Sequence, residues 1–509
     1  MHIIRETLQS SIGGEIYGMN TDLSSPRENN LQEHQSFAGL YRPLHTVGHV
    51  RKLTTLLLIL GACTNASEPP PTDQVTAPSS VVSDAGSSDF GDPPVVPEGP
   101  LDPAIDNEIG GLIVSVEQEG FDSEALDEIG AGRDARVAWF LADLLRFYQG
   151  GSTGSHISRV FRDLTGATLD TSTSPAFVDA FNRLIAWDLP AWEGYETRKG
   201  ELYTILEPGW QPFFDENVSI DWRWVTWGGV LIDDRPLGEP NPCVRGCIPA
   251  LDDPPTVPAE EATWLADSDI VFGVVHNGEA LAMPRNQMEV HEMLNLSLGG
   301  DRLGIPYCTL CGSAQAYLTE SVPPEFSTVI LRTSGLLSRS NKVMYDLVTK
   351  SVFDTFTGEA RSGPLAIADV VLPQVTVVTS AWGDWVEDHP TTRVVAEDGG
   401  LGRTYAPNPL GDRDAEGPIF PVGPVDPRLD VHAKVVGVIT SDGTPIAFPV
   451  ASAATALDRG DPVALEGHEV VSDGGGWRVV GPDGEVVAHE SFWFAWSQFH
   501  PETLLWADD

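Results

Sequence analysis

The chain has 509 residues with 74 acidic and 30 basic side chains, which gives a formal net charge of −44 at pH 7. Residues 1–62 carry five acidic and five basic side chains, so the whole excess of negative charge lies beyond them. Such a surface repels phosphate backbones and anionic lipid, and we therefore expect no nucleic acid partner.

A short apolar run that ends in a cysteine lies near the N-terminus. Arg51 and Lys52 precede the run 53–60, whose last residue begins the sequence Leu60-Gly61-Ala62-Cys63. The run is shorter than the roughly 20 residues of a membrane-spanning helix, and it resembles a bacterial lipoprotein signal with its lipobox. The resemblance implies cleavage before Cys63, a lipid on its thiol, and an exported protein anchored in the bacterial cell envelope, on its periplasmic or outer-membrane face.

The segments on either side of this signal carry no pattern of a fold. Residues 1–46 precede the signal segment at 47–63, which indicates a misassigned start codon or, alternatively, an unusually long leader. Residues 64–104 are rich in Pro, Ser and Asp and show neither a helical nor a strand period, so we expect a disordered tether.

Residues 105–215 predict a small all-helical domain. Apolar residues follow a helical stripe over 134–149, with Asp134 as N-cap and Gly150-Gly151 as the stop. Ser155 is the expected cap of the next helix, and Ser174-Pro175 opens a third. This domain is the expected surface for an envelope protein partner.

Residues 220–509 predict a β-rich domain, so the expected fold class is α+β. The run 270–284 predicts a hairpin around Asn277-Gly278, and a similar pattern returns at 435–449. Trp382-x-x-Trp385-x-x-x-His389-Pro390-x-Thr392 also returns at 493–503. These echoes indicate a diverged internal duplication with halves near 265–395 and 430–505. Since His389 and His500 share one aromatic frame, we expect both to be structural.

The first half contains a cysteine block that the second half lacks. Cys308 and Cys311 form a Cys-x-x-Cys pair, which can bind a soft metal ion or close a reactive disulfide. His291 could add an imidazole for copper, zinc or iron, and Glu292 a carboxylate.

Two further cysteines, Cys243 and Cys247, lie in a loop rich in Pro and Gly. They indicate a local disulfide. A four-cysteine metal site with Cys308 and Cys311 stays open as an alternative.

Several motifs follow one another in an order that resembles the domain of unknown function 3179 family, in which a His-Glu pair and a Tyr-Cys-Pro-Leu-Cys-Gly-Ser block are hallmarks. They are Gly246 to Pro254, Gly273 to Ala280, His291-Glu292, Tyr307 to Ser313, Val343 to Asp346, Thr357 to Ala360 and Trp493 to Thr503. The resemblance spans roughly 220–505 and implies export, but no established activity. The chain departs from the family at Thr309, where proline is usual, and at Val290, where tryptophan is usual.

The leading hypothesis is an anchored extracytoplasmic protein with one thiol-centred site that binds a metal or cycles as a dithiol. His291, Cys308 and Cys311 would be the ligands, and Glu292 would orient the imidazole. The alternative is a non-catalytic protein-binding module whose cysteines form structural disulfides. A hydrolase that uses Glu292 or Asp346 with His291 is a third hypothesis, although the sequence shows no nucleophile elbow, zinc-protease helix or phosphate loop.

Overall fold

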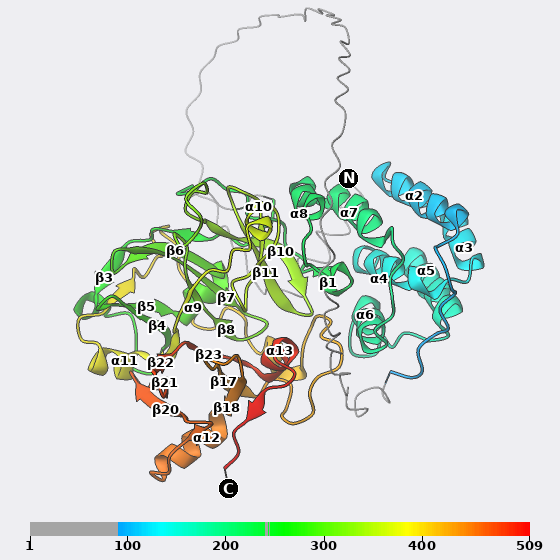
Figure 1. The fold of residues 1–509 in the computed structure, drawn as a ribbon. Helices are drawn as coiled ribbons and strands as arrows, with labels where there is room; N and C mark the ends of the chain where they lie inside the picture. Colours follow the sequence, from blue (N-terminus) through cyan, green and yellow to red (C-terminus); the bar gives the residue numbers. More distant parts are fainter. Residues whose placement is uncertain (1–89, 240–242, 244, 509) are drawn as a thin grey trace, which may run out of the picture. The chain divides into compact units, whose positions relative to one another are not determined.

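The computed structural model describes residues 90–239, 243 and 245–508. Cys63, the expected signal at 47–63 and most of the expected tether lie outside these residues. Within the described ranges, helices occupy the first part of the chain and strands dominate the rest, which confirms a helical region followed by a β-rich region (Figure 1). None of the described helices is long and apolar enough to cross a membrane.

The last part of the expected tether, residues 90–102, has neither helix nor strand. Its carbonyl groups nevertheless accept hydrogen bonds from side chains of the helical region. Arg183 Nη1 donates to Phe90 O at 3.0 Å, and Arg136 Nη1 donates to Gly99 O at 2.7 Å. This end of the segment is therefore held against the helices.

The helical region begins at Pro103, directly after the N-cap Asp102, whose carboxylate accepts the Ala104 N–H. Its α-helices are α2 (Pro103–Glu117), α3 (Ser123–Ala131), α4 (Ala138–Phe147), α5 (Gly151–Thr165), α6 (Ala176–Ala186), α7 (Tyr195–Leu206) and α8 (Gln211–Asp215).

Helix α5 begins four residues before the cap that we expected. Gly150 is its N-cap, and the Ser155 hydroxyl donates back to the Gly151 carbonyl at 2.8 Å. Because Ser155 bonds the backbone of its own helix, it does not cap it. The two glycines that we expected to stop the preceding helix start the next one instead.

The first two sheets contain Cys308 and Lys342, whose N–H contacts the Cys308 sulfur. The first sheet has the order β1 (Val225–Trp227), β10 (Leu331–Ser338), β11 (Asn341–Asp346), β12 (Val352–Asp354) and β13 (Ala360–Ser362). The second has the order β14 (Gln374–Val375), β9 (Ala316–Leu318), β7 (Asp301–Cys308), β6 (Met293–Leu298) and β2 (Leu251–Asp252), with β8 (Ser313–Ala314) paired to β7.

The other three sheets contain the remaining strands. The third has the order β15 (Val378–Ala381), β4 (Ile270–His276), β5 (Glu279–Pro284), β16 (Arg393–Val395) and β3 (Thr256–Pro258). The fourth has the order β23 (Ala488–Phe492), β17 (Lys434–Ile439), β18 (Pro445–Pro449) and β24 (Leu504–Leu505). The fifth has the order β19 (Ala464–Leu465), β20 (His468–Asp473), β21 (Gly476–Gly481) and β22 (Gly484–Val486).

Short helices connect these strands, and they are α9 (Arg285–His291), α10 (Pro364–Ile367), α11 (Trp382–Asp388), α12 (Val450–Asp458) and α13 (Trp493–Phe499).

The third and fourth sheets share one topology. In each, a central antiparallel hairpin pairs on one side with an antiparallel strand and on the other with a parallel strand. A tryptophan of the helix that follows the antiparallel strand donates its indole N–H to a threonine, Trp385 to Thr392 at 3.0 Å and Trp496 to Thr503 at 2.9 Å. Gly273 and Gly437 lie directly against these two indoles, where a Cβ would not fit.

The helical region and the first sheet share one hydrophobic core. Buried residues of the helices, among them Trp139 and Phe181, belong to the same cluster as Trp227 of β1 and Tyr345 of β11. The helices are therefore packed against the sheet that contains Lys342, a residue of the candidate site.

Candidate functional site

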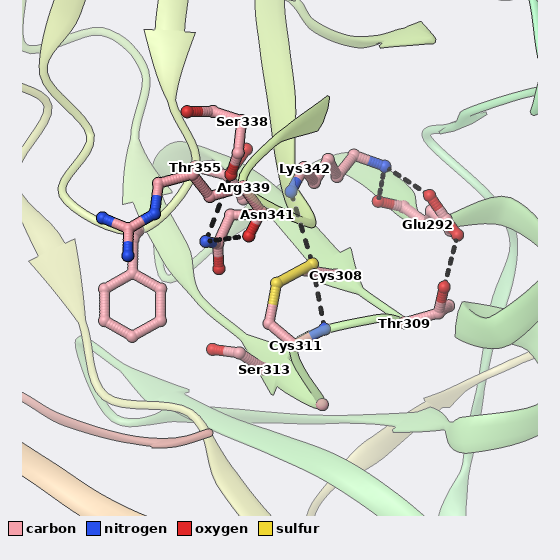
Figure 2. Close-up of a disulfide and its surroundings, with 12 residues drawn as sticks. Glu292, Cys308, Thr309, Cys311, Ser313, Ser338, Arg339, Asn341, Lys342 and Thr355 are labelled. Atoms are coloured by element: carbon pink, nitrogen blue, oxygen red, sulfur yellow. Dashed lines mark hydrogen bonds and ion pairs between the residues drawn. A yellow bond between two sulfur atoms is a disulfide. The ribbon is translucent and has the colours of Figure 1, made fainter. Parts of the chain in front are cut away.

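The Cys-x-x-Cys pair lies at the end of a hairpin, and its two sulfurs form a disulfide (Figure 2). Strand β7 ends at Cys308, and β8 begins at Ser313, with which Cys308 is paired. Gly312 has φ 59° and allows the chain to turn between them. Cys308 is 2% exposed and Cys311 1% exposed, so the disulfide lies inside the protein.

Backbone hydrogen bonds distinguish the two sulfurs. Cys308 Sγ accepts the N–H of Cys311 at 3.2 Å and the N–H of Lys342 at 3.4 Å. No hydrogen bond from the described residues reaches Cys311 Sγ. Since N–H donors favour a negatively charged sulfur, Cys308 is the better thiolate of the pair once the disulfide opens.

A buried ion pair lies beside Cys308. Lys342 Nζ donates to Glu292 Oε2 at 2.9 Å, to the Glu292 carbonyl at 3.0 Å and to Thr333 Oγ1 at 2.9 Å. Thr309 Oγ1 donates to the other carboxylate oxygen, Glu292 Oε1, at 2.8 Å. Burial lowers the pKa of Lys342, and the charge of Glu292 opposes this shift. The carboxylate thus has a partner for each oxygen.

Arg413 brings a further positive charge to this site from a distant part of the chain. Its Nη2 donates to the Thr309 carbonyl at 2.7 Å, and its Nη1 donates to Thr309 Oγ1 at 3.2 Å. A cavity of about 40 Å³ is lined by Cys308, Glu292, Lys342 and Arg413, among others. A cavity of this size admits a few water molecules, since one water needs roughly 10–15 Å³.

Glu292 has a left-handed backbone conformation with φ 52°, which is uncommon for a residue other than glycine. It is the C-cap of α9, so the chain turns directly after His291. As a result, the two adjacent side chains of the His-Glu pair have different partners.

The structure does not bring His291 together with the cysteines. The ring is fully buried, with Nδ1 at 2.7 Å from the Pro249 carbonyl and Nε2 at 2.8 Å from the Tyr405 hydroxyl. The carbonyl can only accept, so Nδ1 carries the proton and Tyr405 donates to Nε2. Both ring nitrogens are therefore engaged, and the expected ligand set of His291, Cys308 and Cys311 is not assembled among the described residues.

Acid is expected to weaken the fold through His291. Burial lowers the pKa of this ring to about 4, while an unfolded histidine titrates near 6.5. Between these values the unfolded chain binds the additional proton, so stability falls as the pH falls from about 6.5 to about 4. We expect a loss of about 2 kcal/mol at pH 5 from this group alone. Urea unfolding at pH 7, 6 and 5 measures it.

A His291→Gln variant is the matched test of this assignment. The variant can be less stable at every pH, but its unfolding free energy should depend less steeply on pH between 6.5 and 5. An unchanged slope would contradict the assignment.

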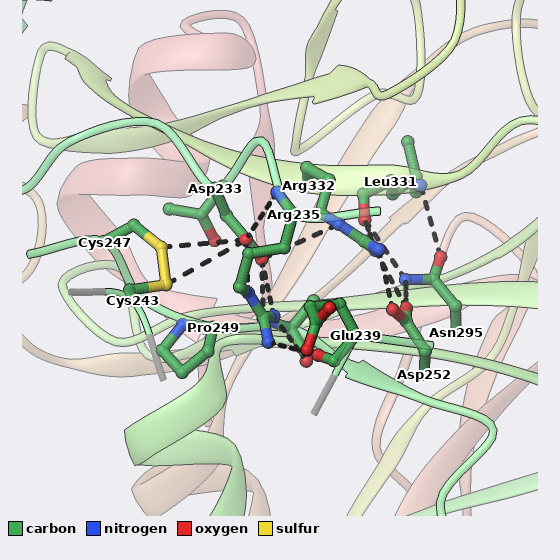
Figure 3. Close-up of polar contacts among 12 residues, drawn as sticks. Asp233, Arg235, Glu239, Cys243, Cys247, Pro249, Asp252, Asn295, Leu331 and Arg332 are labelled. Atoms are coloured by element: carbon green, nitrogen blue, oxygen red, sulfur yellow. Dashed lines mark hydrogen bonds and ion pairs between the residues drawn. A yellow bond between two sulfur atoms is a disulfide. The ribbon is translucent and has the colours of Figure 1, made fainter. Parts of the chain in front are cut away.

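The other two cysteines form a separate disulfide beside a buried ion cluster (Figure 3). Asp233 Oδ1 lies 3.6 Å from Cys247 Sγ and 4.0 Å from Cys243 Sγ. These three residues form the one group of metal-ligating side chains found in the described part of the chain. Two disulfides thus take the place of the four-sulfur centre that the sequence left open.

The buried carboxylate of Asp233 already has protein partners. Arg235 donates to both of its oxygens, at 2.7 and 2.9 Å, and the Ala250 N–H donates to Oδ2 at 2.9 Å. Arg332, fully buried, lies 3.6 Å from Asp233 and donates to both oxygens of Asp252 at 2.7 and 2.8 Å. This compensated charge needs no metal ion.

Asp346, one of the two carboxylates of the hydrolase hypothesis, has a structural role. Asp346 Oδ1 accepts the Ile330 N–H at 2.8 Å, and Oδ2 accepts the Thr349 N–H at 2.7 Å. These bonds fix the turn after β11. No contact between Asp346 and His291 occurs in the described part of the chain.

The sequence motifs missed Lys342 and Tyr405, which contact expected site residues, and Arg413, which bonds Thr309 between the two cysteines. For Lys342 a signal existed. Only four lysines follow Lys52, and two of them, Lys199 and Lys342, are buried in ion pairs. In a chain that otherwise uses arginine, a lysine inside a strand pattern indicates a specific partner.

Comparison with known proteins identifies one family match. No curated protein and no solved structure matches the chain. Residues 245–480 match the family model described as "Protein of unknown function (DUF3179)". The matched segment includes His291, Glu292 and the Cys308–Cys311 disulfide, and it agrees with the motifs that indicated the same family. Residues 245–480 of this chain therefore belong to the DUF3179 family.

Proposed function

We propose that the Cys308–Cys311 disulfide is the functional centre of the protein and exchanges electrons with dithiols. The observation that carries the proposal is the pair of backbone N–H groups that contact Cys308 Sγ, at 3.2 and 3.4 Å. The buried Glu292 and Lys342 pair holds the adjoining backbone in place. Together these contacts favour Cys308 as a stabilised thiolate.

The exchange begins when a thiolate of a substrate dithiol attacks Cys311 Sγ. The S–S bond breaks, and Cys308 leaves as the thiolate, because the better stabilised thiolate leaves faster. The second substrate thiol then attacks the mixed disulfide, and Cys311 is released. The substrate becomes a disulfide, while two electrons and two protons pass to the two cysteines. The reverse reaction reduces a substrate disulfide.

The metal-binding alternative requires the reduced form, because a disulfide sulfur is not a thiolate ligand. A copper, zinc or iron ion would then have two sulfurs at 308 and 311 and would need ligands other than His291. The contacts of the oxidised pair support the redox proposal more directly.

The second candidate function is a protein-binding module with structural disulfides. In it, the helical region would be the surface that binds an envelope protein. The burial of both sulfurs, 2% and 1% exposed, favours it. Structural disulfides resist reduction in the native protein, whereas exchanging ones do not.

The reduction potential separates the two functions. Structural disulfides typically have reduction potentials below about −300 mV. We expect the reduction potential of the Cys308–Cys311 pair to lie above this value. A Cys243→Ser and Cys247→Ser variant leaves this pair as the only disulfide of residues 64–509. Equilibration in dithiol buffers, alkylation of free thiols and mass spectrometry give the potential. A pair that becomes reduced only after unfolding would support the structural alternative.

Single variants test the roles of the two sulfurs. Cys311→Ser leaves the Cys308 thiol with its two N–H donors, and Cys308→Ser leaves Cys311 without them. We expect alkylation of Cys308 to begin at lower pH than alkylation of Cys311. Equal pH profiles, or the reverse order, would contradict the assignment of Cys308 as the thiolate.

We propose in addition that the protein is exported and anchored through a lipid on Cys63. The proposal rests on the lipobox pattern at 51–63. A Cys63→Ser variant should move from the membrane fraction to the soluble fraction and lose label from a radioactive fatty acid, because the acyl chains are the anchor. Retention of the variant in the membrane fraction would argue against lipidation.

We also propose that the β-rich region arose by internal duplication, with halves near 265–395 and 430–505. The shared strand order of the third and fourth sheets supports this origin. So do the equivalent tryptophan–threonine hydrogen bonds of Trp385 and Trp496.

A further inference from the structure

The fourth sheet has a histidine where the third sheet has a valine. Val378 of β15 pairs with Gly273, and His489 of β23 pairs with Gly437. The two positions are equivalent, because each glycine lies against the tryptophan of the following helix. Valine thus satisfies the packing of this position in one sheet, and an imidazole occupies it in the other.

His489 is buried without a hydrogen-bond partner for Nε2. The residue is 8% exposed, and its ring lies edge-to-face with that of Phe356, with centroids 4.7 Å apart. Burial lowers its pKa to about 3, so the ring is neutral at pH 7. A buried polar atom without a partner destabilises a fold, and in a native protein it calls for an unseen partner.

His500 shows a second departure between the two sheets. Its counterpart His389 packs on Trp385 and has its Nε2 at 2.9 Å from Asp473 Oδ1. His500 packs on Trp496 in the same way, at 4.4 Å, but its ring forms no hydrogen bond with the described residues. The expected structural role fits His389, while His500 lacks the partner that such a role supplies.

Both imidazoles line one cavity of about 480 Å³. This volume lies within the range of small-molecule sites, about 300–1,000 Å³. Among the described residues, neither a lysine nor an arginine lines this cavity, whereas aromatic and acidic side chains do. The residues that matter here are Phe356, His468, Asp483, His489, Trp496 and His500.

We propose that this cavity binds a flat aromatic molecule, neutral or cationic, whose N–H or O–H group donates to an imidazole nitrogen of His489 or His500. Phe356 and Trp496, 3% and 1% exposed, are the aromatic hydrocarbon surface of the lining that such a molecule would pack on. Asp483 and the absence of basic groups from the described lining disfavour an anion. The three histidines do not place their nitrogens within 4.8 Å of one another, so a three-imidazole metal site is not preformed.

Three molecules that share the indole ring but differ in charge test the proposal on the full-length protein. Indole is neutral, tryptamine is a cation and indole-3-acetate is an anion. Calorimetric titration should show binding of indole and tryptamine, and about tenfold or more weaker binding of indole-3-acetate. His489→Val should lower the affinity for tryptamine about tenfold while the melting temperature stays equal or rises, because valine occupies the equivalent position.

His389→Gln is the matched control, since its ring is paired outside the cavity, and it should leave the affinity unchanged. Three results would overturn the proposal: no binding of indole or tryptamine at about 1 mM, equal binding of the anion, or full binding by both His489→Val and His500→Gln. Stoichiometric Zn²⁺ binding that His489→Val abolishes, without indole binding, would assign the cavity to a metal instead.

Discussion

Replacing Lys342 by methionine is expected to lower the free energy of unfolding by about 3–5 kcal/mol. Lys342 is 4% exposed. Its ammonium donates to two oxygens of Glu292 and to Thr333 Oγ1, so all three N–H donors are used. Methionine fills the space but leaves the Glu292 carboxylate buried without its counter-charge. Urea denaturation with a linear extrapolation to water measures the loss.

Two controls separate the buried ion pair from the change in net charge. Lys350→Met removes the same charge from a partly exposed lysine that lies over the Tyr345 ring at 5.3 Å, and it should cost about 0.5–1 kcal/mol. The double variant Glu292→Gln, Lys342→Met removes both charges and should recover part of the loss. A Lys342→Met loss no larger than that of Lys350→Met would mean that the pair is not buried as described.

The same variant tests how the site is divided. Lys342 contacts Cys308 through its backbone N–H, at 3.4 Å, which the side-chain substitution retains. We therefore expect Lys342→Met to leave the reduction potential of the Cys308–Cys311 pair nearly unchanged, although it lowers the free energy of unfolding. A large shift in potential would assign the ammonium itself a role in stabilising the thiolate.

The sequence predicted those features of the site that local spacing encodes. Cys308 and Cys311 are three residues apart, so the motif alone indicated either a disulfide or a metal site, and the structure contains the disulfide. The hairpin around Asn277-Gly278 follows from turn chemistry in the same way, since Asn277 and Gly278 have positive φ angles. The expected cap Asp134 is also local, and its carboxylate accepts the Arg136 N–H at the start of a short helical turn.

The contacts that the sequence could not predict join residues far apart in the chain. Lys342 meets Glu292 across 50 residues, Arg413 meets Thr309 across 104, and Tyr405 meets His291 across 114. Periodicity and spacing contain no information on such pairings. They also led us to group His291 with Cys308, 17 residues further along the chain, whereas its ring is bonded to Pro249 and Tyr405.

Replacing Asp143 by alanine should produce a loss of similar size, about 3–5 kcal/mol, at the contact between the helices and the first sheet. Asp143 and Lys199 have side chains that are fully buried and 2.8 Å apart. Tyr195 and Tyr203 donate their hydroxyls to the carboxylate, both at 2.8 Å. Burial raises the pKa of Asp143 and lowers that of Lys199, so both charges depend on the pair.

The loss should reach beyond the helices, because Lys199 Nζ also donates to the Val225 carbonyl of β1 at 2.6 Å. Without Asp143 the ammonium retains this carbonyl, the Tyr195 hydroxyl at 3.1 Å and the Tyr203 ring, 4.9 Å away, but loses its ion-pair partner. The variant Asp143→Leu, Lys199→Met removes both charges and should recover part of the loss, but not all of it, because the Tyr195 and Tyr203 hydroxyls then lack their acceptor. If that double variant is as unstable as Asp143→Ala, packing at these positions, and not the unpaired ammonium, is what determines the stability of the contact.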